Sequence, residues 1–181
     1  MESYQIGEGA GLYYLTFTVV EWLPVFVAEE PCLLITDSLN HCHRHKHLRI
    51  NAFVIMPTHL HLILFDADFD NERLCGTLRD MRQYTGRMLA DYCEKKMPDA
   101  FADVIRNPQR RDRARQFWQQ SKHPVAIWSA DFWRTKVTYV HDNPRRKGLV
   151  TDVTAWRFSS AGYWLGEPPG ETDVVLSEVI W

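Results

Sequence analysis

Runs and alternations of apolar residues predict the strands of this chain. The stretch from Leu12 to Val20, LYYLTFTVV, is rich in aromatic and β-branched residues, which favour strands. The apolar stretch from Asn51 to Phe65 is broken at Met56-Pro57-Thr58, and because proline cannot donate to a ladder, two short strands joined by a turn, or an edge strand, are expected. A further strand is predicted around Val125 to Trp128.

Three other segments carry apolar residues at helical spacing. Glu29 to His47 is expected to form the first helix, and Asn71 to Lys96 a second, longer one. A third helix is predicted to start at Ser129, a favoured capping residue, and to end near Asn143 because Pro144 follows. The order of strands and helices predicts a protein of mixed α and β structure.

The third helix has two chemically different faces. At about 100° per residue, Lys136 and Asn143 fall on the same face as Tyr139, together with Phe132. The opposite face is apolar and is expected to be buried; it carries Trp133, Val137 and Val140. This arrangement predicts a tyrosine at the margin of the core with its hydroxyl free, while the alternative is a tyrosine that only packs and hydrogen-bonds.

Length and composition indicate one domain. The 181 residues are 45% hydrophobic and 13% aromatic, which suits one well-packed domain, expected over residues 1–165, with a proline-interrupted tail at residues 166–181. No apolar run approaches the roughly 18 residues of a membrane span, and no leader segment is recognisable, so a cytosolic (cytoplasmic) protein with no membrane partner is expected. The four cysteines are scattered and are expected to be reduced thiols.

Positive charge is concentrated in one part of the chain. The net charge is −2, but the segment from Arg106 to Lys147 holds eleven Lys or Arg against three acids, a surplus of eight. Screening confines electric fields to roughly 10 Å at moderate salt, so a local basic patch can hold a phosphate backbone on an acidic protein. A solvated loop is the alternative for the arginines from Arg110 to Arg115, since the segment from Met97 to Arg115 is expected to be a loop or a short extra helix.

Two histidines interrupt the apolar stretch that follows Pro57. In a strand, residues two apart point to one face, so His59 and His61 would emerge together. Paired imidazoles form a two-pronged site for a divalent ion that leaves positions open for other ligands. The alternative is a pair of hydrogen-bonded histidines on a half-exposed strand. A second histidine group, from His41 to His47, favours a solvated basic helix end over a zinc site.

Three sequence motifs together resemble one protein family. PTHLHLILF at residues 57–65, VTYVHDNPRRKG at residues 137–148 and WRFSS at residues 156–160 are similar to motifs of the REP-associated tyrosine transposases. These are members of the HUH single-strand endonucleases, in which two histidines flank a hydrophobic residue. The resemblance runs from the first strand to about Tyr163. It implies a single-tyrosine HUH transposase-like domain with an α+β, ferredoxin-like fold, in which helices pack on one face of an antiparallel sheet.

The resemblance also implies a reaction. Tyr139 would be the catalytic nucleophile, and His59 and His61 would bind Mg²⁺ or Mn²⁺, with Asn143 as the third metal ligand. The partner would be single-stranded DNA with a palindromic-repeat hairpin, cut through a 5′-phosphotyrosine by a monomer or a homodimer. Residues expected to bind DNA are Arg79, Arg82, Arg110, Arg111, Arg113, Arg115, Lys136, Arg145, Arg146 and Lys147.

Three alternatives stay open at this point. Tyr84, on a basic helix soon after the histidines, is the rival nucleophile. A protein that binds hairpins without cutting them would serve as a regulator of repeats. A metal-independent RNA-binding protein would prefer ribose-containing strands.

Overall fold

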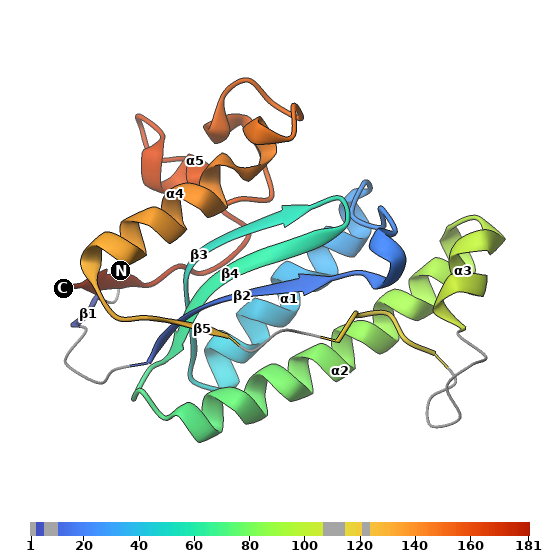
Figure 1. Cartoon of the computed structure of the whole chain (residues 1–181), viewed down its shortest axis with the longest axis horizontal. Coiled ribbons are helices and arrows are strands. Elements are labelled where there is room, and N and C mark those ends of the chain that lie inside the picture. Colours follow the sequence, from blue (N-terminus) through green and yellow to red (C-terminus); the bar gives the residue numbers. More distant parts are fainter. Residues whose placement is uncertain (1–2, 6–10, 107–114, 121–123) are drawn as a thin grey trace.

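The computed structural model describes residues 3–5, 11–106, 115–120 and 124–181, with side chains from residue 11 onward. Its centre is a four-stranded antiparallel sheet in the order β3-β4-β2-β5 (Figure 1). The elements that build it follow one another as β-α-β-β-α-β: β2 (Leu12–Thr18), α1 (Glu29–His45), β3 (Leu48–Met56), β4 (His59–Asp66), α2 (Asn71–Lys96) and β5 (Val125–Ile127). This connectivity is that of a ferredoxin-like unit, and the predicted α+β class is confirmed.

The remaining elements surround this unit. They are β1 (Ser3–Gln5), η1 (Val20–Trp22), α3 (Asp99–Ile105), α4 (Ala130–Arg146), η2 (Val153–Ala155), α5 (Ala161–Leu165) and β6 (Glu178–Ile180). For the segment from Met97 to Arg115, a loop or a short extra helix was expected, and α3 is such a helix. Strands β1 and β6 pair in parallel. Among the described residues, none of the helices combines the length and apolar character that a bilayer crossing requires.

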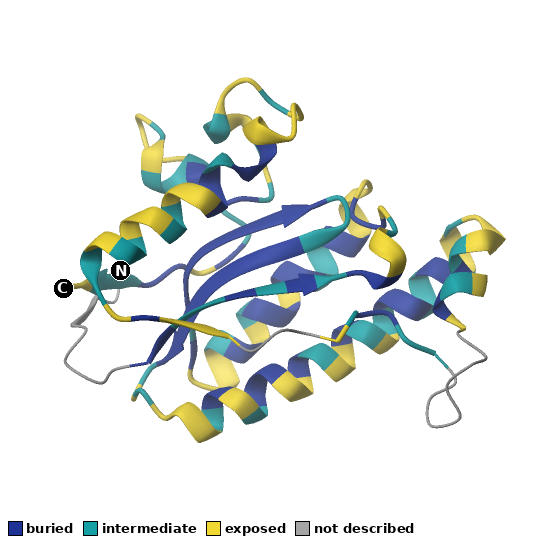
Figure 2. Cartoon of the chain, in the orientation of Figure 1, coloured by how far each residue is buried: buried dark blue, intermediate teal, exposed yellow. Residues whose placement is uncertain are grey.

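The sheet is buried between helices on both sides. Leu60, Leu62 and Leu64 of β4 point into a core shared with α1 and α2, whereas Ile63 and Phe65 join a second core that includes Val140 of α4. Figure 2 shows the central strands mainly in the buried colour between these helices. The expectation of helices on one face therefore holds for α1 and α2, and α4 adds cover to the opposite face. The side chains of His59 and His61 alternate with the leucines, so they face α4.

Strands β3 and β4 form a hairpin around Pro57 and Thr58. Two strands joined by a turn were one of the two predicted alternatives, and the other, an edge position for the histidines, is excluded because β4 lies between β3 and β2. The turn is tied to the loop after β2, since the amide of Val19 donates to the carbonyl of Thr58 at 3.0 Å. This tie places the loop that follows β2 beside the first histidine.

Helix α4 runs further than the sequence predicted. Its start is capped as expected, because the Oγ of Ser129 accepts from the amide of Phe132 at 3.2 Å. Its predicted end near Asn143 is wrong, since the helix includes Pro144 and ends at Arg146. A proline there removes a single intrahelical hydrogen bond in the last turn, where the next carbonyls find other donors: the amide of Lys147 donates to Asn143 at 3.1 Å.

Segments after α4 cover the outer edge of β3. The amide of Ile55 donates to the carbonyl of Phe158 at 2.8 Å, and the amide of Ser160 donates to Phe53 at 3.0 Å. Closer to the C-terminus, the amide of Ser177 donates to Ile50 at 2.8 Å, and Leu176 forms a single parallel bridge with Ile50. The boundary expected at residue 165 stays a prediction, although part of the expected tail packs against β3.

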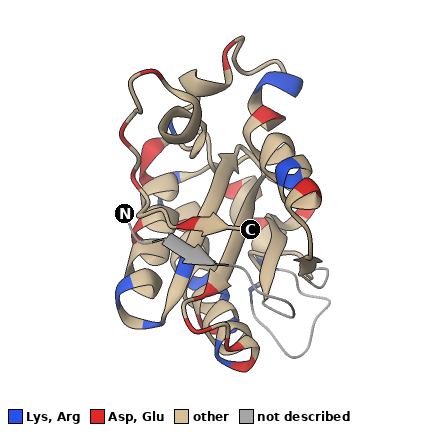
Figure 3. Cartoon of the chain, turned by 90° about the vertical axis from the view of Figure 1, so that its left-hand side faces the viewer, with Lys and Arg blue, Asp and Glu red and all other residues tan. Residues whose placement is uncertain are grey.

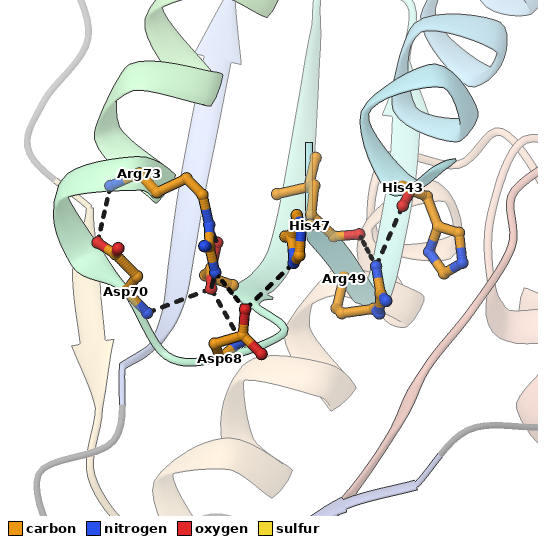
Figure 4. Close-up of polar contacts among 8 residues, drawn as sticks. His43, His47, Arg49, Asp68, Asp70 and Arg73 are labelled. Atoms are coloured by element: carbon orange, nitrogen blue, oxygen red, sulfur yellow. Dashed lines mark hydrogen bonds and ion pairs between the residues drawn. The ribbon is translucent and has the colours of Figure 1, made fainter. Parts of the chain in front are cut away.

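Asp66, at the end of β4, bonds to Asp68, Asp70 and Arg73, which Figure 4 shows where β4 leads into α2. Asp66 is 1% exposed and accepts from the amides of Asp68 and Asp70 at 2.9 and 3.2 Å. Its second oxygen accepts from Nε of Arg73 at 2.7 Å. Burial opposes ionisation, but the hydrogen bonds from Arg73 and from the two amides prevail and lower the pKa of Asp66. Asp66 therefore helps to hold the turn from sheet to helix, together with Asp70, whose side chain accepts from the amide of Arg73 at 2.9 Å.

Candidate metal and tyrosine site

His59 and His61 stand together on the face of the sheet that α4 covers. Their ring centroids are 4.7 Å apart. Because β4 is a central strand, His61 is almost fully enclosed, at 4% exposure, whereas His59 near the turn is half-buried. The predicted two-pronged arrangement of imidazoles is therefore present in the fold.

Hydroxyl groups hold one nitrogen of each ring. Nδ1 of His61 lies 2.9 Å from the Tyr14 hydroxyl and 2.8 Å from Oγ1 of Thr16, and these two hydroxyls also bond to each other at 3.2 Å. Nδ1 of His59 lies 2.9 Å from Oγ1 of Thr58. In contrast, Nε2 of His61 is buried and has no hydrogen-bond partner among the described residues. A ring anchored at Nδ1 with a free Nε2 is the usual state of a metal-binding histidine.

Both imidazoles are kept neutral by their surroundings. Burial lowers the pKa of His61 to about 3, with further lowering from His59 and Lys136. Burial lowers the pKa of His59 to about 4, and Lys147 contributes. Neutral imidazole offers a lone pair to a metal ion, whereas imidazolium does not. At neutral pH the pair is therefore ready to bind a divalent cation without losing protons.

The donors present fit such an ion, although the pair alone does not complete a site. Among the described residues, no third His, Cys, Asp or Glu joins the two histidines in a metal-binding group. The predicted third ligand, Asn143, lies on α4 and is buried, at 4% exposure. An amide carbonyl is an acceptable ligand for Mg²⁺ or Mn²⁺, which also retain water readily.

The structure brings Tyr139 to the histidines and leaves Tyr84 apart from them. The Tyr139 ring lies edge-on to His61, with centroids 5.4 Å apart, and it is 37% exposed. The guanidinium of Arg146 lies 5.3 Å from the Tyr139 ring centroid. Tyr84 belongs to α2, on the other face of the sheet, where it lines a hollow of about 540 Å³ between α1 and α2 together with His41.

Four of the cations predicted to bind DNA are on or directly after α4. Lys136 lies over the Tyr14 ring, with Nζ 4.6 Å from its centroid. Arg145 is paired with Asp142 at 2.6 Å, and Arg146 and Lys147 follow at the helix end. Figure 3 shows Lys and Arg in the middle and at the end of α4, interspersed with the acids of the same helix. The area around Tyr139 therefore offers several positive groups to an anionic ligand.

The other predicted cations lie on the opposite face of the sheet or outside the described residues. Arg79, Arg82 and Arg115 line a hollow of about 780 Å³ beside α2. Arg115 already pairs with Asp91 at 2.5 Å, and Arg82 bonds to the carbonyl of Gln119. Arg110, Arg111 and Arg113 fall outside the residues that the structure describes. The fold thus separates this group from the histidine pair.

Sequence reasoning missed the neighbours that β2 and its following loop supply. Tyr14 stacks against His61 with centroids 5.6 Å apart, and Trp22 lies edge-on to His59 at 5.8 Å. Thr16 pairs directly with His61 in the register of β2 and β4. Alternation along β2 puts Tyr14 and Thr16 on one face, but only the strand register shows that this is the histidine face.

Comparison with known proteins supports the fold. No protein-family model and no curated protein sequence matches the chain. Among solved structures, the chain is similar to a REP-associated tyrosine transposase bound to a REP hairpin, with a TM-score of 0.62 and 19% sequence identity. The match covers 97% of this chain and 92% of that one. At this identity, the likeness shows a shared fold over nearly the whole length.

Proposed function

We propose that this chain is a metal-dependent single-stranded DNA endonuclease and strand transferase that acts on palindromic-repeat hairpins. One observation carries the proposal: a pair of neutral histidines with a free buried nitrogen lies against the ring of a half-exposed tyrosine. The similar fold of a transposase bound to a REP hairpin supports the choice of DNA as substrate.

Tyr139 is the proposed nucleophile. Its phenolic oxygen bonds to the scissile phosphorus, the bond from phosphorus to the 3′ oxygen breaks, and the phenolic proton is balanced by the proton taken up at the new 3′-hydroxyl. The products are a 5′-phosphotyrosine and a free 3′ end, and attack by a second 3′-hydroxyl reverses the step and joins strands. Because the phosphate ester is conserved throughout, no ATP is needed.

His59 and His61 are the proposed ligands of Mg²⁺ or Mn²⁺, with Asn143 as the third. When bound, the ion would withdraw charge from the scissile phosphate and orient it. The protein's own contribution is to keep both imidazoles neutral and to hold their Nδ1 atoms, through Tyr14 and Thr16 for His61 and through Thr58 for His59.

Cations divide into two proposed groups. Lys136, Arg145, Arg146 and Lys147 are near Tyr139 and would contact phosphates next to the cleaved bond. Arg79, Arg82 and Arg115 lie across the sheet and, with Arg110, Arg111 and Arg113, would hold the hairpin stem. Such a substrate would extend around the edge of the sheet.

A covalent-adduct assay tests the proposal. The protein is incubated with labelled hairpin oligonucleotides and Mn²⁺ and run on a denaturing gel, where a slower labelled protein band reports phosphotyrosine. We expect Tyr139→Phe to abolish this band and Tyr84→Phe to retain it. The opposite pattern would assign the reaction to Tyr84.

A hairpin-binding protein without nuclease activity is the second candidate. It is favoured by the lack of a third acidic, cysteine or histidine ligand among the described residues. Hairpin binding without an adduct across several repeat sequences, with Mg²⁺ or Mn²⁺ present, would select this second function.

A further inference from the structure

Two exposed aromatic side chains, Trp22 and Tyr139, contact the histidine pair. Among the described residues, the exposed aromatics are Trp22, Tyr84, Trp128, Tyr139 and Trp181. Trp128 is 75% exposed and Trp22 is 58% exposed, which leaves two large apolar rings in water. Trp22 contacts His59, and Tyr139 contacts His61. Rings this exposed contribute little to the stability of the fold, and they leave flat apolar faces accessible to a ligand.

Trp22 is held beside His59 by an unusual backbone. Glu21 and Trp22 both have positive φ angles, 49° and 55°. A bulky residue in this region is strained and persists only where its surroundings impose it. Here the amide of Trp22 donates to the carbonyl of Val19 at 3.1 Å, and the amide of Leu23 donates to Val20 at 3.2 Å. These hydrogen bonds hold the loop in a strained conformation in which the Trp22 indole is exposed beside His59.

Trp128 begins a ladder of rings that leads to His61 from the other direction. Trp128 stacks on Phe132 with centroids 4.6 Å apart and an angle of 26° between the rings. Nζ of Lys136 lies 5.2 Å from the Phe132 centroid and 4.6 Å from that of Tyr14. Tyr14 in turn stacks against His61. A cation is thus inserted between aromatic faces.

The strand register arranges these side chains in a line. Thr18 of β2 pairs with His59, Thr16 with His61, and Leu12 with Ile127, the residue before Trp128. Trp22 follows β2 at the His59 end, and Trp128 lies beyond the other end. We call Trp22, His59, His61, Tyr14, Phe132 and Trp128 the aromatic row. Tyr139 lies against the middle of this row, so a single strand of DNA lying along the row would pass the proposed nucleophile.

We propose that the aromatic row binds unpaired bases on both sides of the cleaved phosphate, one stacked on Trp22 and another on the Trp128–Phe132 pair. This inference rests on the proposed function and specifies how its substrate is held. Every base has a flat face that stacks on an aromatic ring, and interleaved cations neutralise the backbone, as in other single-strand sites. Lys136, Arg146 and Lys147 supply that charge along the row.

Binding measurements without cleavage test the row. The full-length Tyr139→Phe protein, without added metal, is titrated into a fluorescein-labelled single strand of about a dozen nucleotides, and anisotropy reports the dissociation constant. We expect Trp22→Ala and Trp128→Ala each to weaken binding about tenfold. Trp22→Phe and Trp128→Phe keep a flat ring, so each should weaken binding by less than half as much as the alanine variant does. Thermal melting of each variant separates lost binding from lost folding.

Abasic oligonucleotides make the test specific to bases. Removing the base at one position should weaken binding by the Tyr139→Phe protein about tenfold and should weaken it no further when Trp22→Ala is also present. Removing the base at a different position should have the same relation to Trp128→Ala. Unchanged affinity of both folded alanine variants would overturn the inference and leave the proposed function standing. No binding of single strands or hairpins by the wild-type chain would overturn the proposed function itself. A self-association abolished by Trp128→Ala, with DNA affinity unchanged, would assign the Trp128 end to contact between copies.

Discussion

Strand β4 has a buried polar side chain near each end, and the two are satisfied very differently. Asp66, at the end that leads into α2, accepts hydrogen bonds from two amides and from Arg73. His61, near the start, has Nδ1 bonded to two hydroxyls, but its Nε2 is buried without a partner in the described part of the chain. Both oxygens of Asp66 are hydrogen-bonded within the protein, whereas one nitrogen of His61 is not.

Under the proposed function, this difference separates the structural role of Asp66 from the metal-binding role of His61. A buried polar atom without a partner costs about 1–3 kcal/mol, so folding alone does not favour the arrangement at His61. Asp66 has no such cost, and its contacts join a strand to a helix. The His61 ring lies against Tyr139 of α4, and the ion that we propose would satisfy its Nε2. Substitutions at the two ends should therefore affect different properties.

The largest expected effect is on reaction at the histidine end. His61→Phe keeps much of the ring volume and removes the free nitrogen, while Tyr14 and Thr16 still bond to each other. Loss of metal-assisted charge stabilisation should slow adduct formation about a thousandfold, with the free energy of unfolding changed by no more than about 1 kcal/mol. Adduct rates on a denaturing gel and urea unfolding check both parts. Adduct formation at the wild-type rate would show that the open nitrogen is not used.

The reverse outcome is expected at the other end of β4. Asp66→Asn removes the charge that faces Arg73 and should lower the free energy of unfolding by about 3 kcal/mol, because a buried partner is lost. Folded protein should still form the adduct at the wild-type rate. Asp68→Asn is the matched control: its side chain is 64% exposed, so a loss of less than about 1 kcal/mol is expected in urea unfolding. Equal losses in the two variants would contradict the structural role of Asp66.

The sequence was sufficient for the main elements and for the histidine end of the comparison. Alternation placed His59 and His61 on one face, and helical spacing placed Tyr139 on the exposed side of α4; both depend on neighbours in sequence. The predicted helix at Asn71–Lys96 has the same bounds in the structure. Local periodicity is reliable where a segment is long and its apolar positions repeat.

What the sequence did not reveal depends on distant parts of the chain. Tyr14 and Thr16 meet His61 across 47 and 45 residues, because strand register is set by tertiary packing. Arg79 and Arg82 could be predicted as basic residues, but which face of the sheet α2 covers does not follow from charge. The positive φ angle of Trp22 has no local sequence signal, since bulky residues normally avoid that region.

Acid should weaken the histidine end well before the aspartate end. Burial lowers the pKa of His59 to about 4 and that of His61 to about 3, below the ordinary value of 6.5. On α4, His141 is also buried, with Nε2 2.8 Å from the Ser160 hydroxyl, and burial lowers its pKa to about 4. As pH falls below 6.5, the unfolded chain takes up protons that the folded chain refuses, so stability falls with falling pH. The lowered pKa of Asp66 keeps its contribution intact until the pH falls below its ordinary 3.8.

One variant isolates this effect. Between about pH 7 and about pH 5, His141 alone should account for about 2 kcal/mol of lost unfolding free energy, because it is 3% exposed and stays neutral. His141→Gln removes the titrating group, so the unfolding free energy of this variant should fall by about 2 kcal/mol less than that of the wild type over the same pH interval. Urea unfolding at a series of pH values measures both curves. Parallel curves for variant and wild type would show that His141 titrates normally in the folded protein.

The smallest expected effect concerns the two hydroxyls that bond to Nδ1 of His61. Tyr14→Phe and Thr16→Val each remove one of two groups that hold Nδ1, and each leaves the other in place. Lost support of a metal-binding imidazole by a neighbouring group typically costs at least tenfold in affinity, so we expect Mn²⁺ to bind each variant about tenfold more weakly, and the double variant weaker still. Calorimetric titration of Mn²⁺ into the DNA-free protein measures this without any cleavage. Thr18→Val, on the same strand and paired with His59 without a hydroxyl bond to it, serves as the control. Unchanged Mn²⁺ affinity in the double variant would show that the two hydroxyls do not support metal binding by His61 and, like the groups around Asp66, serve the fold alone.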